Sequence, residues 1–376
     1  MKNVVKIIFH IDLNAFYCSC AIIKEPYLKD KVFAIGGSGV TRRGVLSTAS
    51  YKARKYGIGS AMNLTDAFER YPKLVVVPSD FKLYRKYSQL FFKFLRTFSD
   101  LVLPASIDEA YVDMTELSKT KHPMQIAKEI QDGLMDLYQL PCSIGIAPTL
   151  FLAKMASDMK KPLGITVIRK KDIVEKLFPL SIKEMHGIGK KTYPRLEEIG
   201  IKTIGDFTKE MNKEPILSLM SKQSYTSYMD LILGRSNHIV DPKKYSVHQS
   251  MSNETTLNYL IDQPEIILKT IDELVDKTYQ RLIKEAYVVK TVGIKLKFSD
   301  FTSMTRSFSF NEYHDDVVVI RNRIHELFEQ YYDGRPVRLI GVSFQQVILK
   351  KDLKVDINLF NYQNFTKRDE DIFNHK

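Results

Sequence analysis

Three acidic side chains stand where two apolar segments of the chain end. Asp12 lies in the apolar run from Ile7 to Leu13, and Asp108-Glu109 follow the stretch that begins at Pro104. Carboxylates at the ends of buried strands cost desolvation free energy unless a cation neutralises them. Hard oxygen ligands suit Mg²⁺, and a pair of such ions catalyses in-line phosphoryl transfer. We therefore expect a fold that gathers these acids into one metal site, and nucleotidyl transfer is the leading hypothesis.

The adjacency of Asp108 and Glu109 leaves two interpretations open. In a regular strand the two side chains would point to opposite faces, so both can reach one metal site only at a turn or strand end. Pro104 and the strand that resumes at Ala110 permit such an end. The alternative is a surface hairpin with two solvated acids. Asp12, flanked by apolar residues, favours the metal site.

Size and charge narrow the class of protein. A chain of 376 residues exceeds what one hydrophobic core usually serves, so two or more domains are expected. The 56 Lys and Arg residues against 44 Asp and Glu give a net charge of +12, which favours a polyanionic partner such as nucleic acid. A bound metal would explain why a chain with excess positive charge carries three acids at the ends of its apolar segments.

Cysteine usage and hydropathy favour a cytoplasmic protein. The three cysteines, Cys18, Cys20 and Cys142, are too few for a disulfide framework and suit a reducing compartment. Cys18 and Cys20 resemble half of a zinc clip, but no Cys or His cluster completes it, so buried thiols are preferred. His10 and Asp12 interrupt the first apolar run before a signal peptide could form, and no apolar stretch reaches the length of a membrane span.

Hydrophobic periodicity predicts an α+β chain in which one topology occurs twice. The first β-α-β-β-α-β unit starts with the strand at Ile7–Leu13 and has a long insertion after its first helix. That insertion contains short strands and a Gly36-Gly37 turn. Residues 172–234 are expected to be mostly helical, and the polar basic stretch 235–246 is expected to be a linker. The strands of the second β-α-β-β-α-β unit are expected at Ser250–Leu257, Val288–Phe298, Met304–Phe310 and Val337–Phe344.

Two segments carry residues suited to a triphosphate. Tyr51 and Arg54 are one helical turn apart, and an arginine fork beside a phenol suits phosphate oxygens. The alternative is an ordinary charged, solvated helix. Lys160 and Lys161 end another expected helix, where cations favour its negative pole and could also bind phosphate.

Two further segments suggest contacts with a nucleic-acid backbone. The hairpin from His186 to Lys191 has two glycines and two lysines between helices, which suits a sequence-independent DNA clamp. In the expected strand Val288–Phe298, Lys295 and Lys297 share one face with Thr291. That face is either an ordinary solvated surface or a basic sheet laid along phosphates.

Five motifs, taken in order, resemble those of a Y-family DNA polymerase, most closely its bacterial DNA polymerase IV branch. They are His-Ile-Asp-Leu-Asn-Ala-Phe-Tyr, Ser-Tyr-Lys-Ala-Arg-Lys-Tyr-Gly, Ser-Ile-Asp-Glu-Ala-Tyr-Val-Asp, Asp-Met-Lys-Lys-Pro-Leu-Gly and His-Gly-Ile-Gly-Lys. The resemblance covers the chain up to about residue 350 and implies a right-hand polymerase. It implies a palm at 1–17 and 82–170, fingers at 18–81, a helical thumb with a helix-hairpin-helix at 171–240, a linker at 241–247, a little finger at 248–350 and a tail at 351–376.

The resemblance also implies roles for single residues. Asp12 and Asp108 would bridge two Mg²⁺ with help from the Leu13 carbonyl, and Glu109 would complete the primer-side ion. The primer 3′-hydroxyl, its pKa lowered by that ion, would attack the α-phosphate of a dNTP and expel pyrophosphate. Tyr17 matches a steric gate whose ring excludes the ribose 2′-hydroxyl. The other implied contacts are Phe16, Tyr51, Arg54 and Lys161 with the dNTP, and Gly187, Gly189, Lys190, Lys191, Lys295 and Lys297 with DNA.

The implied activity is template-directed, low-fidelity DNA synthesis past lesions, in DNA repair and damage tolerance, by a monomer that does not bind membranes. Its partners would be primer–template DNA, dNTPs and the replicative sliding clamp. The tail segment Asp356–Phe360 resembles a clamp-binding motif through Leu359 and Phe360 but lacks the usual Gln.

Two rival functions remain on the sequence alone. A nucleotide cyclase could share the β-α-β-β-α-β unit and the two-metal site, but it needs neither the glycine hairpin nor the second unit. A catalytically inert DNA-binding protein would keep the basic surface but would have no use for Asp12, Asp108 and Glu109 together. Turnover of ATP alone or of dNTPs with Mg²⁺ would separate the three.

Overall fold

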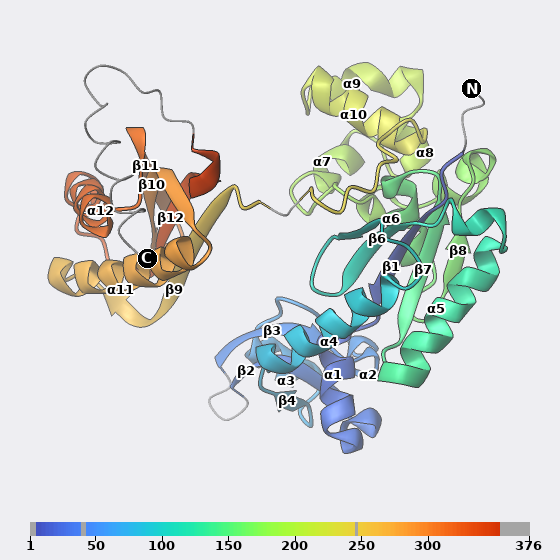
Figure 1. Ribbon diagram of the computed structural model, residues 1–376, viewed down its shortest axis with the longest axis horizontal. Coiled ribbons are helices and arrows are strands. Elements are labelled where there is room, and N and C mark those ends of the chain that lie inside the picture. Colours follow the sequence, from blue (N-terminus) through green and yellow to red (C-terminus); the bar gives the residue numbers. More distant parts are fainter. Residues whose placement is uncertain (1–4, 39–42, 245–246, 354–376) are drawn as a thin grey trace, which may run out of the picture. The chain divides into compact units, whose positions relative to one another are not determined.

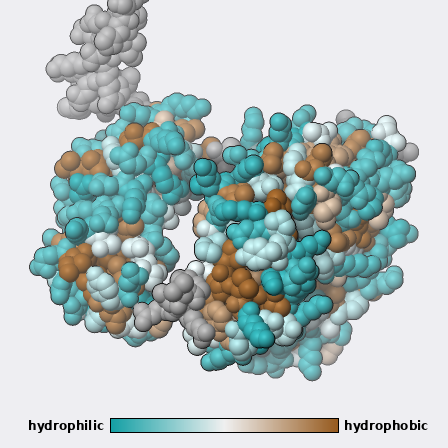
Figure 2. All heavy atoms as spheres, turned by 90° about the horizontal axis from the view of Figure 1, so that it is seen from below, coloured by the Kyte–Doolittle hydropathy of each residue, from teal (hydrophilic) through white to brown (hydrophobic). Residues whose placement is uncertain are grey.

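The computed structural model describes residues 5–38, 43–244 and 247–353 and divides the chain into two compact units (Figure 1). The boundary between them falls after Lys244, within the range expected to be a linker. Hydrophilic side chains cover most of the face shown in Figure 2, with hydrophobic side chains gathered in a patch on the first unit. None of the helices in the described parts is long and apolar enough to cross a lipid bilayer.

The first unit is built on a five-stranded sheet with β1 at its centre. β1 (Ile8–Leu13) pairs antiparallel with β6 (Glu109–Asp113) on one side and with β7 (Cys142–Ala147) on the other. β5 (Val102–Pro104) and β8 (Ile165–Val167) complete the order β5-β6-β1-β7-β8. Every residue of β1 is buried, which explains why the run is almost continuously apolar.

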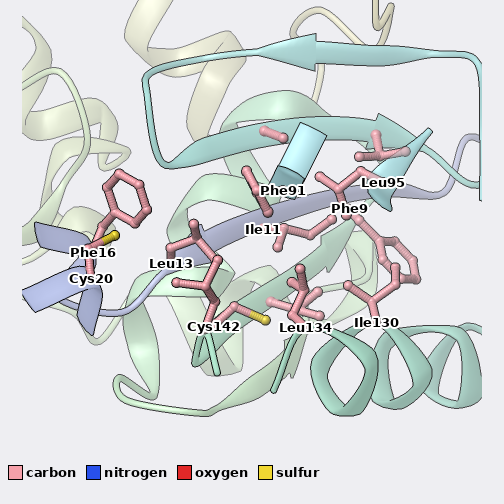
Figure 3. Close-up of a cluster of buried hydrophobic side chains, with 14 of the residues drawn as sticks. Phe9, Ile11, Leu13, Phe16, Cys20, Phe91, Leu95, Ile130, Leu134 and Cys142 are labelled. Atoms are coloured by element: carbon pink, nitrogen blue, oxygen red, sulfur yellow. The ribbon is translucent and has the colours of Figure 1, made fainter. Parts of the chain in front are cut away.

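Alternation along β1 divides its side chains between two layers. Phe9, Ile11 and Leu13 belong to a core shared with α4 (Phe81–Leu95) and α5 (Pro123–Tyr138) (Figure 3). Figure 3 shows these side chains meeting Phe91, Leu95, Ile130, Leu134 and Cys142. The other residues of the strand, Ile8, His10 and Asp12, face α6 (Leu150–Met159).

Helix α6 lies unusually close to β7, and a glycine permits this. A Cβ atom at Gly145 would lie 2.0 Å from the Ala153 carbonyl oxygen and 2.4 Å from the Ser157 nitrogen. Thr149 caps the helix, since its hydroxyl accepts the Leu152 N–H at 3.3 Å. The helix axis is therefore fixed against the sheet.

The insertion after α1 (Phe16–Lys24) forms a small sheet with its own core. Its strands, in spatial order, are β3 (Arg43–Ala49), β2 (Phe33–Ser38) and β4 (Val75–Val77). A 3-10 turn at Pro26–Asp30 leads into it, and α2 (Tyr51–Arg54) and α3 (Leu64–Arg70) accompany it. The expected Gly36-Gly37 turn is wrong: both residues lie within β2, where a Cβ at Gly36 would lie 2.7 Å from the Val45 carbonyl oxygen.

Residues 172–234, expected to be mostly helical, form several short helices. They are α7 (Tyr193–Glu198), α8 (Ile204–Phe207), α9 (Lys213–Leu217) and α10 (Lys222–Ile232), with single turns at Lys170–Asp172, Ile173–Leu177, Ile182–Glu184 and Glu210–Asn212. Leu152 and Met155 of α6 belong to the same core as this segment. The backbone N–H of His186 also donates to the Met155 sulfur at 3.3 Å. Helix α6 thus serves both the large sheet and the helical segment.

The second unit has the expected β-α-β-β-α-β order. Its strands β9 (Ser250–Ile261), β10 (Tyr287–Phe298), β11 (Ser303–His314) and β12 (Val337–Leu349) pair antiparallel in the order β11-β10-β12-β9, and a 3-10 turn at Lys350–Asp352 follows. The apolar faces of α11 (Pro264–Lys284) and α12 (Val317–Tyr331) pack on one side of this sheet.

Candidate active site

Asp12 and Glu109 meet at one end of the large sheet. They occupy opposite positions on the neighbouring strands β1 and β6, and their carboxyl groups are hydrogen-bonded. Burial, and then the hydrogen bond to Glu109, raise the pKa of Asp12 to about 7. Burial alone would raise the pKa of Glu109, but hydrogen bonds from His10, Asp12 and Lys154 lower it instead. The two acids therefore behave as one pair, here called the acid pair.

Asp108 lies beside the acid pair, immediately before β6 begins. Its carbonyl oxygen accepts the Leu13 N–H at 3.0 Å, which ties it to the end of β1. The Ser106 hydroxyl donates to the Asp108 carboxylate at 2.6 Å, and burial raises the pKa of Asp108. The three acids thus lie near one another at the same strand end.

Two lysines occupy the space between the carboxylates. The Lys154 ammonium lies 2.7 Å from Glu109 and 3.2 Å from Asp12, and the Lys161 ammonium lies 2.6 Å from Asp12. Asp158 accepts from both, at 3.4 Å from Lys154 and 2.7 Å from Lys161. Within the described ranges, no three His, Cys, Asp or Glu side chains are close enough to hold a metal ion. The carboxylate oxygens nevertheless suit a hard divalent ion, which would have to share them with these ammonium groups.

Lys154 and Asp158 are site residues that the sequence did not reveal. The sequence indicated Lys160 and Lys161 for phosphate and gave no role to Lys154 or Asp158. The available signal was spacing, because Lys154 and Asp158 are four residues apart and so share one face of α6, and Lys161 follows three residues later, just beyond the helix.

His10 is a further support of the acid pair. It is fully buried and lies two residues before Asp12 in β1, so the two side chains share the face toward α6. Its Nδ1 lies 2.8 Å from the Ser157 hydroxyl, and its Nε2 lies 3.7 Å from Glu109. Burial lowers the pKa of His10. The ring thus links α6 to the Glu109 carboxylate.

Tyr17 and Phe16 open helix α1 next to these acids. The Tyr17 ring stacks on Tyr84 with centroids 4.2 Å apart and meets Phe81 edge-on. Burial, and then the charge of Asp108, raise the pKa of Tyr17. The Phe16 ring is buried in the core, so only its backbone can contact a nucleotide.

Tyr51 and Arg54 form the short helix α2. The Arg54 guanidinium lies 4.7 Å from the centre of the Tyr51 ring, and it donates to the Ala49 carbonyl oxygen at 3.0 Å. Burial raises the pKa of Tyr51, and Arg54, Lys161 and Asp12 act on it through their charges. The guanidinium is thus held by the backbone at Ala49 and beside the Tyr51 ring.

The glycine hairpin is exposed where DNA contact is expected. Gly187, Gly189, Lys190 and Lys191 are all exposed, whereas Ile188 between them is buried and anchors the loop. Gly187 has a φ of 95°, and its carbonyl oxygen accepts the hydroxyl of Tyr228 at 3.0 Å. The two lysines thus stand on an anchored turn.

On the expected lysine face of the second unit, one lysine is paired with an acid and the other lies over an aromatic ring. Lys295 lies 2.8 Å from Glu254, and the Lys297 ammonium lies 5.1 Å from the centre of the Phe301 ring. Across the strands Lys295 pairs with Gly341 and Thr305, and Lys297 pairs with Leu339 and Ser303. Leu359 and Phe360 lie outside the described residues.

Comparison with known proteins gives matches to both units. The impB/mucB/samB family matches residues 11–158, and the C-terminal domain of that family matches residues 248–359. "DNA polymerase IV" of Oceanobacillus iheyensis is 38% identical over 97% of this chain and 87% of its own length. "DNA polymerase IV" of Clostridioides difficile is 36% identical over 97% of this chain and 99% of its own length.

Solved structures agree. A Y-family DNA polymerase chimera of Dbh and Dpo4 is 25% identical and superposes with a TM-score of 0.80, covering 91% of this chain and 99% of its own. An insertion ternary complex of Dbh DNA polymerase, also 25% identical with the same coverage, superposes with a TM-score of 0.66.

Proposed function

The chain belongs to the impB/mucB/samB family, the Y-family DNA polymerases of the DNA polymerase IV type, and we propose that its acid pair is the centre of nucleotidyl transfer. The activity is that of a DNA-directed DNA polymerase that serves translesion synthesis. The supporting observation is that Asp12 and Glu109, 97 positions apart in sequence, lie in register on neighbouring strands beside Asp108, with both carboxylates on the Lys154 ammonium.

Metal ions belong to this proposal, since Y-family polymerases depend on them. Asp12, Asp108, Glu109 and the Leu13 carbonyl would hold two Mg²⁺, which when bound stabilise the attacking and leaving oxygens of an in-line displacement. The donor set fits in kind, because all of its atoms are hard oxygens, and the three carboxylates would have to draw closer together to share an ion. Asp12 and Glu109 then orient the reacting groups, and β1 and β6 keep the two carboxylates opposite one another.

The other residues divide the work of binding. Lys161, Tyr51 and Arg54 would hold the triphosphate of a dNTP, since Lys161 already lies 2.6 Å from Asp12. The Phe16 backbone would support the same group. Tyr17 would exclude the ribose 2′-hydroxyl with a ring that Tyr84 and Phe81 hold in place.

We assign the domains as the family pattern implies. The palm takes 1–17 and 82–170, the fingers 18–81, the thumb 171–240, the linker 241–247 and the little finger 248–350. The hairpin at 187–191, together with Lys295 and Lys297, would contact primer–template DNA through its phosphates. The proposal has three further parts. The enzyme copies with low fidelity, it works as a monomer in the bacterial cytoplasm, and it attaches to the sliding clamp through Leu359 and Phe360.

The decisive experiment replaces one acid of the pair. Glu109→Gln keeps the size of the side chain but removes its charge, so primer extension with dNTPs and Mg²⁺ should fall by about 10²-fold or more, the scale of losing one electrostatic catalytic group. Fluorescence anisotropy should show unchanged affinity for primer–template DNA. Glu129→Gln, an exposed change on α5, is the matched control and should extend normally. Undiminished extension by Glu109→Gln would overturn the assignment.

A further inference from the structure

We propose that Lys154 is a positioning residue whose ammonium holds the acid pair together without metal and competes with a divalent cation for it. The inference rests on the proposed function, because it takes Asp12 and Glu109 as metal ligands. It goes further by tying metal affinity to one buried side chain of α6.

The contacts of Lys154 support a role specific to the pair. Its side chain is 11% exposed, and its ammonium touches Glu109 at 2.7 Å and Asp12 at 3.2 Å. These acids come from adjacent strands and face each other across β1 and β6. A buried ammonium is stable only when carboxylates surround it, and two buried carboxylates are stable together only when a cation lies between them. Each partner therefore requires the other.

The backbone keeps this ammonium in place. Lys154 lies in the middle of α6, and the residues on either side of it, Ala153 and Met155, are buried. The helix cannot retreat from β7, since Gly145 leaves no gap between them. Lys161 differs, because it follows the end of α6 and its side chain is 26% exposed. Lys154 is thus the fixed cation of the site and Lys161 the more accessible one.

The consequence for metal binding has a definite sign. A divalent ion that approaches Asp12 and Glu109 meets a positive charge already bound to both, so Lys154 weakens its binding. The negative triphosphate of a nucleotide offsets that repulsion. With Lys154 present, the pair should hold a metal ion poorly by itself and well in company with a nucleotide.

The test measures Mn²⁺ binding to the full chain without DNA or nucleotide, by electron paramagnetic resonance of the free ion. Lys154→Met should bind Mn²⁺ about tenfold more tightly than the wild type, as expected when a neighbouring like charge is removed. Its thermal midpoint should fall in EDTA and recover in excess Mn²⁺. Lys154→Arg, which keeps the charge, and Lys160→Met, an exposed change at the end of α6, should bind Mn²⁺ as the wild type does.

Each outcome decides between the ideas. Unchanged or weaker Mn²⁺ affinity in folded Lys154→Met, or equal tightening in Lys154→Arg, overturns the role of Lys154. Lys154→Gln gives a second neutral variant, and failure of both neutral variants to fold even with Mn²⁺ would also overturn it. Glu109→Gln separates the two proposals. If this variant binds Mn²⁺ as the wild type does, the acid pair is not the metal site and the proposed function is overturned. If it loses Mn²⁺ while Lys154→Met gains none, only the Lys154 inference fails.

Discussion

Tyr17 is the residue at which selection between sugars should be decided. Its ring is fixed by stacking on Tyr84 and by the edge contact with Phe81, so it cannot move aside for a larger sugar. Tyr17→Ala should therefore raise ribonucleotide incorporation relative to deoxyribonucleotide by about tenfold or more. The measurement is the ratio of kcat/KM for single insertions of the two nucleotides. Tyr17→Phe keeps the ring and should keep the selectivity, and an unchanged ratio in Tyr17→Ala would exclude a gate at this position.

Single residues also show what sequence can and cannot reveal. Asp12 is predictable, because an acid inside an apolar strand needs a partner. Lys154 is not, because a lone lysine in an apolar helix is normally expected to extend its charge into solvent. Its role depends on Asp12 and Glu109 standing in register across two strands, which local pattern does not specify. The hydrogen bond from Ser106 to the Asp108 carboxylate is local, between residues two apart, and the sequence analysis gave it no role.

At the scale of one element, the start of α8 gives a prediction about pH. The Asp206 carboxylate binds Lys209 and accepts the backbone N–H of Thr203, and these hydrogen bonds lower its pKa to about 2. A pKa below that of the unfolded chain adds stability above about pH 4, which is lost as the pH falls toward 2. Asp206→Asn should thus cost about 1 kcal/mol at neutral pH, the usual worth of a cap.

Thermal unfolding of wild type and Asp206→Asn between pH 7 and pH 2.5 checks this. The difference in midpoint should be constant above about pH 4 and should shrink below it, because the wild-type carboxylate then becomes protonated. Asp136→Asn, an exposed change on α5, serves as the control and should unfold as the wild type does. A difference that stays constant down to pH 2.5 would contradict the capping role.

Elements with strong periodicity agree closely with expectation. The sequence predicts a helix from Pro123 to Tyr138, and α5 spans these residues, since proline starts it and its apolar face repeats at helical spacing. Apolar spacing in α12 also predicts Tyr331 on its buried face, but Tyr331 is 37% exposed because it is the last residue of the helix; Arg306 lies over its ring. The turn expected at the two glycines of β2 was wrong for a different reason. Gly36 is needed because the backbone of β3 approaches it too closely for a side chain, not because the chain turns there.

For the whole molecule, the net charge of +12 leads to a prediction about salt. Phosphate contacts release counterions, so affinity for primer–template DNA should fall by at least about tenfold between 50 and 200 mM salt. Lys190→Ala with Lys191→Ala should reduce the slope of log K against log salt by about 2. Lys119→Ala with Lys121→Ala, whose side chains are already paired with Glu116 and Glu129, should leave it unchanged. A flat salt response would argue against phosphate contacts.

The two units were predictable as topologies because each repeats the same order of strands and helices. Their active-site geometry was not, because it depends on how closely α6 approaches β7 and on which strand lies beside β1. Those are contacts between residues far apart in the chain, such as Asp12 with Lys161.

Helix α6 also contacts three parts of the first unit. It is wedged on the sheet at Gly145, it carries Lys154 to the acid pair, and its Met155 sulfur receives the N–H of His186 at the root of the glycine hairpin. Because Lys154 and Met155 are adjacent in α6, the carboxylate site and the base of the glycine hairpin are both held by the same short stretch of one helix.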